Sequence, residues 1–309
     1  MTDPLISNAV ILGIVEGITE FLPVSSTGHL LIAERWLPRQ TDLFNIVIQT
    51  GAVLAVIPLF HKRFHQFIYK WSDPAVRNYF FKIVVAFFIT GAGGYALEKK
   101  GFKLPEELFP VGVALLVGGI LFLVVEGWLA RRNRGAGPDA ERSDIRHVTW
   151  TVAVAVGLGQ LVAAVFPGSS RSGTTIILAL ILGLSRPLAT EYSFLVSIPT
   201  MLAAGGYKIF ESFHHKTGEA PPENWTMVII ATLVAAVVSF IAVKWLLQYV
   251  QTHTFNAFGW YRIIVGVAIL WFVIQVRPQP ALNHGQSHAL APVVVQHLVP
   301  PQLAYCKVF

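Results

Sequence analysis

The chain has 309 residues, of which 54% are hydrophobic and 13% are charged, whereas soluble domains carry about 25% charged residues. These proportions, with a mean hydropathy of +0.60, exclude a soluble enzyme and a disordered chain. The single cysteine, Cys306, excludes a disulfide framework and a cysteine-based metal site. We therefore predict an all-α integral membrane protein. The net charge of +6 does not indicate a nucleic-acid partner, because the basic residues gather in short loops between apolar runs.

Seven apolar runs along the chain resemble spanning helices of about 20 residues, and two further apolar regions are broken or open with a polar turn. The seven runs are 43–60, 81–97, 109–130, 148–166, 187–207, 226–243 and 258–276. Residues 5–33 are interrupted by Pro23, and residues 167–184 begin with the polar turn. The N-terminus lacks a basic segment, so we expect no signal peptide. Residues 277–309 show no helical period and are expected to form a disordered or peripheral tail.

Loop charge predicts the orientation of the chain in the membrane. Residues 61–82 carry five Lys or Arg against one Asp, and residues 131–147 carry five Arg against three acids. Residues 208–225 carry two Lys against three Glu. Because cytoplasmic loops are enriched in Lys and Arg, the first two loops are expected inside and the third outside.

Two segments 144 residues apart share one spacing of glycine, acid or amide, proline and serine. The matching residues are Gly13, Glu16, Glu20, Pro23, Ser25 and Ser26 in the first segment, and Gly157, Gln160, Ala164, Pro167, Ser169 and Ser170 in the second. A basic loop follows the first segment and an acidic loop follows the second, so the halves are expected to lie with opposite orientation.

The predicted fold is therefore an inverted-topology repeat with about six transmembrane helices and two re-entrant helix hairpins. Residues 1–147 would form the first repeat, with its hairpin at about 5–38, and residues 148–276 the second, with its hairpin at about 148–184. Both termini would lie outside. The alternative is that 5–22 and 148–166, which are long enough, each cross the bilayer.

The first motif places two acids and a histidine in an apolar setting. Glu16 and Glu20 are four residues apart and share one helix face. Such a pair holds a hard cation or a proton, unless the helix lies at the interface, where both acids touch water. Ser25 and Thr27 fit either a helix N-cap or an anion site at a helix start. His29 is either a packed histidine or part of the site.

The second motif crowds five hydroxyl residues, two glycines and Arg171 into residues 167–175. An arginine fork fits a phosphate with two parallel hydrogen bonds, and the neighbouring hydroxyl and N–H groups would complete the cradle. The alternative is that Arg171 pairs with Glu16 or Glu20 to hold the halves together. The spacing is not that of a P-loop, so a nucleotide is not expected.

Three other charged residues lie within or near the apolar runs. Glu126 is near the cytoplasmic end of its run and is expected to extend to the interface. Glu191 and Arg262 lie near the ends of runs in the second half and are expected either to pair or to support the site.

Together the two motifs resemble those of the bacterial undecaprenyl-diphosphate phosphatase family, also called the bacitracin-resistance protein family. The first runs from Glu16 to His29 as EGITEFLPVSSTGH, and the second runs from Pro167 to Thr175 as PGSSRSGTT. The likeness extends from about residue 5 to 276, with further blocks at 44–49 and 261–262. The family often has Glu where this chain has Asn45, so no role for an acid is carried over there.

The resemblance implies an enzyme of the bacterial inner membrane whose active site opens to the periplasm. It would remove the terminal phosphate of the C55 polyprenyl diphosphate, return the monophosphate carrier to cell-wall synthesis and confer bacitracin resistance. A divalent cation, Mg²⁺ or Ca²⁺, would be held by Glu16 and Glu20. The partners would be this lipid substrate and the membrane lipids, and a homodimer is left open.

Carried over by position, Ser26 is the expected nucleophile and His29 its general base, with His29 as nucleophile the rival assignment. Glu20 and Arg171 complete the catalytic set. The residues expected to bind phosphate are Ser25, Thr27, Ser170, Arg171, Ser172 and Thr175. A different class, a polyprenyl-phosphate flippase or transporter, would use the same residues to bind the headgroup without hydrolysis.

Overall fold

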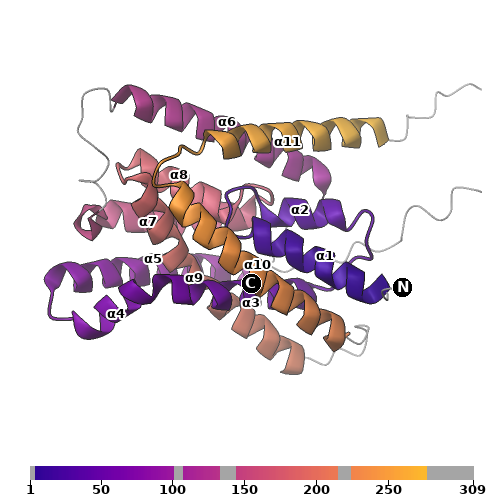
Figure 1. Cartoon of the computed structure of the whole chain (residues 1–309), viewed down its shortest axis with the longest axis horizontal. Coiled ribbons are helices and arrows are strands. Elements are labelled where there is room, and N and C mark those ends of the chain that lie inside the picture. Colours follow the sequence, from indigo (N-terminus) through magenta and orange to yellow (C-terminus); the bar gives the residue numbers. More distant parts are fainter. Residues whose placement is uncertain (1–3, 101–106, 133–143, 215–223, 277–309) are drawn as a thin grey trace, which may run out of the picture.

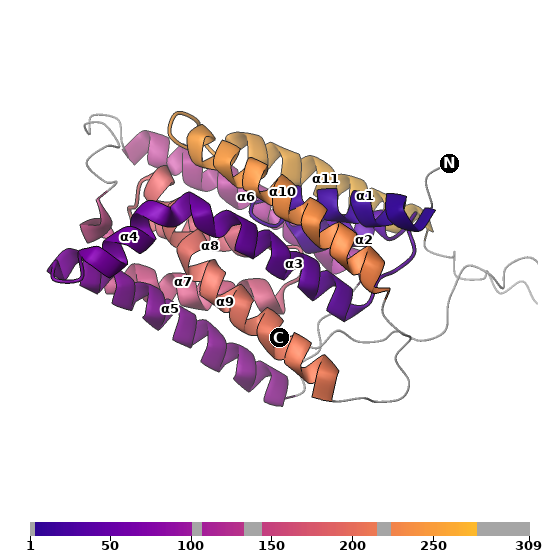
Figure 2. The same cartoon turned by 60° about the horizontal axis from the view of Figure 1, so that its bottom comes forward.

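The computed structural model describes residues 4–100, 107–132, 144–214 and 224–276, and all regular secondary structure in these ranges is helical. Two long helices, α6 and α11, lie side by side along one edge of the molecule (Figures 1 and 2). The first half contains α1 (Pro4–Thr19), α2 (Ser26–Ala33), α3 (Asp42–Val56), η1 (Ile57–Phe60), α4 (His61–Tyr69), α5 (Pro74–Lys99) and α6 (Leu108–Arg132). The second contains η3 (Ile145–His147), α7 (Trp150–Val165), α8 (Arg171–Ile181), α9 (Arg186–His214), α10 (Trp225–Tyr249) and α11 (Asn256–Val276).

Six helical stretches in the described ranges are long and apolar enough to cross a membrane, as the sequence predicted. They are Asp42–Tyr69, Pro74–Lys99, Leu108–Arg132, Arg186–Glu211, Trp225–Tyr249 and Asn256–Gln275. Large apolar side chains on them point outward: Leu233, Ile264 and Trp271 are each more than 60% exposed. Water would penalise such surfaces, and lipid does not. The chain is therefore a multi-pass membrane protein.

The first of these stretches differs from the prediction. It continues past residue 60 into α4, so the first nine residues of the basic segment 61–82 extend this helical stretch. Residues 74–82 of the same segment already belong to α5. Pro58 lacks an N–H and interrupts the α-helix, which tightens into the 3₁₀ turn η1 before α4 resumes. The connection between α4 and α5 is correspondingly short, residues 70–73.

In each half of the chain, a turn at the sequence motif separates two short helices. A turn of six residues separates α1 from α2, and one of five separates α7 from α8. α1 has 16 residues and would span about 24 Å, which is less than the roughly 30 Å of a hydrocarbon core. Pro23 and Pro167 lie in these turns, where a missing N–H does not disturb a helix.

The motif glycines let each broken helix approach a long one. A Cβ on Gly13 would lie 2.6 Å from the Ala231 carbonyl of α10, and a Cβ on Gly157 would lie 2.9 Å from the Ala86 carbonyl of α5. Any larger residue would push these helices apart. Thus α1 packs on α10, and α7 packs on α5.

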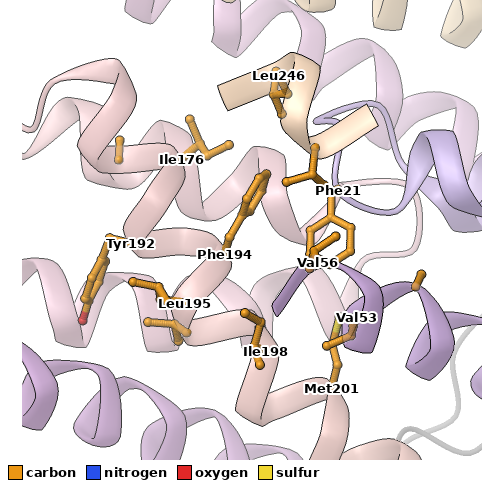
Figure 3. Close-up of a cluster of buried hydrophobic side chains, with 14 of the residues drawn as sticks. Phe21, Val53, Val56, Ile176, Tyr192, Phe194, Leu195, Ile198, Met201 and Leu246 are labelled. Atoms are coloured by element: carbon orange, nitrogen blue, oxygen red, sulfur yellow. The ribbon is translucent and has the colours of Figure 1, made fainter. Parts of the chain in front are cut away.

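A buried aromatic cluster supports the first break. The rings of Phe21 and Phe194 meet edge to face at 5.2 Å, and Phe60 meets Phe194 at 6.4 Å. Figure 3 shows Phe21 and Phe194 side by side, with Val56 beside Phe21. All four side chains are almost fully buried. The turn after α1 is thereby anchored to α9, which fixes the position of Glu20, the residue before Phe21.

Candidate active site

A cavity of about 340 Å³ lies between the two helix breaks. Its size suits a small polar ligand. Arg39 and Asp42 also line it and are exposed, so the cavity opens at the end of the bundle where α3 begins. The motif residues that line it are Glu20, Ser25, Ser26 and Thr27 from the first half, and Pro167, Gly168, Ser170 and Arg171 from the second.

Glu20 joins the two motifs at this cavity. The Ser26 hydroxyl donates a hydrogen bond of 2.6 Å to one carboxylate oxygen of Glu20. The Arg171 guanidinium forms an ion pair with the other oxygen. The Glu20 side chain is 3% exposed and that of Arg171 is 26% exposed, so both line the cavity and the carboxylate is the more deeply buried of the pair. The ion pair between Arg171 and Glu20 that the sequence left as an alternative is therefore present.

The helices α2 and α8 begin in the same unusual way. Ser25 and Ser170 each cap the helix that follows, with backbone φ of 76° and 66°. Their hydroxyls accept hydrogen bonds from the N–H groups of Gly28 at 3.4 Å and Gly173 at 3.2 Å. The left-handed conformation costs about 1–2 kcal/mol at a residue with a Cβ. Both helix N-termini, which attract anions, are held at the cavity by this geometry.

Ser172 and Thr175, which were expected to bind phosphate, donate hydrogen bonds to backbone carbonyls instead. Ser172 donates to the Leu22 carbonyl at 3.1 Å and so ties the second break to the first. Thr175 is fully buried and donates to the Arg171 carbonyl of its own helix at 2.8 Å. Within the described part of the chain, neither residue lines the cavity. Sequence spacing could not show that these hydroxyls turn back onto backbone carbonyls.

His29 faces α11 and not Ser26. Its Nδ1 lies 2.7 Å from the Ser25 carbonyl, and its Nε2 lies 2.7 Å from the Tyr261 hydroxyl. A carbonyl only accepts, so Nδ1 carries a proton; when the ring is neutral, Nε2 accepts from the Tyr261 hydroxyl. The expected hydrogen bond between Ser26 and His29 is replaced by the one between Ser26 and Glu20. His29 is not among the described residues that line the cavity.

Arg262 holds both breaks, in agreement with the supporting role that the sequence indicated as one of two alternatives. This side chain is fully buried. Its Nη1 donates to the Pro23 carbonyl at 3.1 Å. Its Nη2 donates to the carbonyls of Gly168 at 3.2 Å, Ser169 at 2.9 Å and Ala114 at 3.3 Å. One guanidinium thus connects the turn after α1, the turn after α7 and α6.

The other two charged residues also differ from expectation. Glu191 does not pair with Arg262 but with Arg63, at 2.5 Å. Glu126 does not extend to the interface: it is 2% exposed, it pairs with Arg186 at 2.6 Å, and it accepts the Phe255 N–H at 2.9 Å. Buried charges are retained when both partners are present. Their partners lie 60 or more residues away in the chain, beyond the reach of local patterns.

Glu16 is a buried acid next to the site, one helical turn before Glu20. It is fully buried, and neither carboxylate oxygen has a hydrogen-bond partner among the described residues. No group of three or more His, Cys, Asp or Glu that could hold a metal occurs in the described ranges. Mg²⁺ is commonly held by one or two carboxylates with substrate phosphates as further ligands, so Glu16 with Glu20 fits a substrate-assisted cation site.

Fold and site together define a helical multi-pass membrane protein with a polar, anion-attracting cavity between two broken helices. Residues 9–268 match the family described as bacitracin resistance protein BacA, and the chain belongs to this family.

Curated relatives cover nearly the same range. The undecaprenyl-diphosphatase of Rhizobium etli strain CFN 42 is 50% identical over 264 residues, which cover 85% of this chain and 95% of the relative. The undecaprenyl-diphosphatase of Xanthomonas euvesicatoria is 49% identical over 264 residues, with coverage of 85% and 95%. That of Xylella fastidiosa is 49% identical over 263 residues, with coverage of 85% and 96%. Residues 277–309 lie beyond the family match and outside the described residues.

Proposed function

We propose that this protein hydrolyses undecaprenyl diphosphate to undecaprenyl phosphate and inorganic phosphate. This activity would return the lipid carrier to cell-wall synthesis and confer bacitracin resistance. The observation that carries the proposal is the position of Glu20, which joins the Ser26 hydroxyl and the Arg171 guanidinium at one cavity. The names of the relatives, which share about half of their residues with this chain, support the same substrate.

The chemistry follows from what each group offers. Arg171 clamps the terminal phosphate, and the N-termini of α2 and α8 stabilise its negative charge. Glu20 accepts the Ser26 proton while the Oγ–P bond forms and the P–O bond to undecaprenyl phosphate breaks. Water then attacks the phosphorus of the phosphoserine and the P–Oγ bond breaks. Glu20 returns its proton to Oγ, and the phosphate leaves as dihydrogen phosphate with both hydrogens of the water. A divalent cation held by Glu16 and Glu20 would neutralise phosphate charge.

Release of phosphate from purified protein in detergent tests this function. Wild-type protein should release one inorganic phosphate per undecaprenyl diphosphate, and Glu20→Gln, which keeps the size but loses the base, should release almost none. A flippase or transporter using the same headgroup site would bind the lipid and release none in either form. Folded wild-type protein that releases no phosphate from undecaprenyl diphosphate would contradict the proposal.

We further propose the inverted repeat, with hairpins at about 5–38 and 148–184 in the repeats 1–147 and 148–276. Three features support it: matching caps at Ser25 and Ser170, matching glycine contacts of α1 and α7, and packing of α1 on α10 and of α7 on α5. The basic residues near α4 lie at the end of α3 opposite the cavity mouth. The positive-inside rule then supports a mouth that opens on the periplasmic side of the inner membrane.

Cysteine labelling tests this orientation in a Cys306→Ser background. A cysteine at residues 70–73 should react only with reagent supplied from the cytoplasm. A cysteine at residues 215–223 should react only with reagent supplied from outside. Reaction of both from the same side would contradict the inverted repeat while leaving the phosphatase assay unaffected.

A further inference from the structure

Gln160 of α7 lines the headgroup cavity and has no partner for its amide. The residue is 2% exposed, and neither its Nε2 nor its Oε1 has a hydrogen-bond partner among the described residues. A buried side-chain amide is normally satisfied by protein or ordered water, because removing it from water without compensation is costly. Gln160 is therefore a binding group that is satisfied only when something occupies the cavity.

Two other hydroxyl groups that line the cavity, those of Thr90 and Ser170, already form hydrogen bonds within the protein. The Thr90 hydroxyl donates to backbone carbonyls. Its oxygen lies 3.0 Å from the Ala86 carbonyl oxygen and 3.1 Å from the Gly157 carbonyl oxygen. The Ser170 hydroxyl accepts the Gly173 N–H as a helix cap and donates to the Ser172 hydroxyl at 3.2 Å, since Ser172 itself donates to Leu22. The Gln160 amide has two N–H donors and one acceptor, all without partners. Among the described side chains of the second half that line the cavity, only Arg171 offers more N–H donors to an anion than Gln160.

The counterpart of Gln160 in the first half points to the same conclusion. At the 144-residue offset the matching position is Glu16, which is also buried without a partner. The first half thus presents the acids Glu16 and Glu20, whereas the second presents a neutral amide and a guanidinium. An acid at position 160 would repel a phosphate, and an amide of the same shape donates to it.

We propose that Gln160 binds the diphosphate headgroup, with its amide N–H donating to a phosphate oxygen beside Arg171. Its Oε1 accepts from a protonated phosphate oxygen or from a bound water. This assignment deepens the proposed phosphatase function and rests on it for the identity of the lipid. The headgroup chemistry itself, a diphosphate, can be tested without any turnover.

The experiment measures binding of inorganic pyrophosphate to full-length protein in detergent, by calorimetry, together with the melting temperature of the unliganded protein. Gln160→Leu should lower pyrophosphate affinity about 10- to 100-fold, as expected for one hydrogen bond to a charged group. It should not lower the melting temperature, because an unsatisfied buried amide is replaced by an apolar side chain. Gln160→Glu should lower the affinity further. Gln251→Leu is the control, since Gln251 is exposed and its amide already donates to the Leu247 carbonyl.

The two measurements separate binding from structure. Lower affinity with an unchanged or higher melting temperature would support the proposal. Unchanged affinity in Gln160→Leu would overturn it, and so would lower affinity together with a lower melting temperature, which would assign Gln160 to folding. Failure of wild-type protein to bind pyrophosphate would overturn it as well. Pyrophosphate binding without hydrolysis of the lipid would refute the phosphatase function and leave the role of Gln160 standing.

Discussion

Replacing Arg262 by lysine is expected to lower kcat/KM, although Arg262 is not among the described residues that line the cavity. The guanidinium makes four hydrogen bonds, to carbonyls of both breaks and of α6. It fits between Gly118 and Gly173, where a Cβ on Gly118 would overlap Nη2. A lysine keeps the charge but has a single nitrogen, which cannot reach the carbonyls of both breaks at once.

The expected magnitude follows from these bonds. If lysine loses two of the four, about 3–6 kcal/mol of interaction is lost, at about 1.5–3 kcal/mol for each hydrogen bond to a charged group. The two turns that carry Ser26 and Arg171 are then free to move apart. Because a misplacement of about 1 Å costs roughly 100-fold in rate, we expect kcat/KM to fall about 100-fold.

Phosphate release and thermal unfolding in detergent measure the two effects. Arg77→Lys is the matched control, because Arg77 is exposed on α5. Gly118→Ala should reduce kcat/KM in the same direction without changing any charge, since its methyl group displaces the guanidinium. Wild-type kcat/KM in Arg262→Lys would refute the reasoning, even if the melting temperature fell.

Three further predictions concern the phosphate clamp, the cation and the core. Arg171→Lys should lose most activity, about 10- to 100-fold in kcat/KM, while still folding, because lysine lacks the two-pronged geometry; equal turnover would exclude the clamp. Chelation should abolish phosphate release, and Mg²⁺ or Ca²⁺ should restore it; full activity in chelator would mean that Glu16 and Glu20 share a proton instead. Phe194→Ala should lower the free energy of unfolding by about 3–5 kcal/mol, because the ring is fully buried against Phe21. Phe88 is exposed, so Phe88→Ala is the control; a smaller loss of stability in Phe194→Ala than in Phe88→Ala would contradict this packing.

The features predicted correctly from the sequence are the local ones. Long apolar runs predict membrane-crossing helices because each must satisfy its own backbone hydrogen bonds. Pro23 and Pro167 mark both breaks because proline cannot continue a helix. The cap at Ser25 follows from the same local chemistry. Each of these depends on residues a few positions apart.

The features that sequence reasoning missed depend on distant partners. Arg262 binds backbone carbonyls, which every residue has, so no pattern of side chains identifies its partners. Glu126 finds Arg186 across 60 residues and remains buried. The direction of His29 depends on Tyr261, which is 232 residues away. These groups come together only when α2, α6, α9 and α11 have packed around the breaks.

The structure changes the prediction for how Ser26 is activated. The sequence indicated His29 as its base, but the Ser26 hydroxyl donates to Glu20, and His29 is bound to Ser25 and Tyr261. A base must lie within reach of the proton that it removes. We therefore expect Glu20→Gln to be as inactive as Ser26→Ala, and His29→Ala to retain more activity than either.

Trapping the phosphoenzyme decides between the two nucleophiles. A serine route gives an acid-stable phosphoserine at Ser26, which Ser26→Ala abolishes, whereas a histidine route gives an acid-labile phosphohistidine at His29. If His29 acts only through its hydrogen bond, Tyr261→Phe should reduce turnover about as much as His29→Ala, because both remove that bond. Phosphohistidine at His29, with substantial turnover in Ser26→Ala, would refute the serine route. It would require the His29 ring to leave Tyr261 and turn into the cavity, and Tyr261→Phe would then raise turnover.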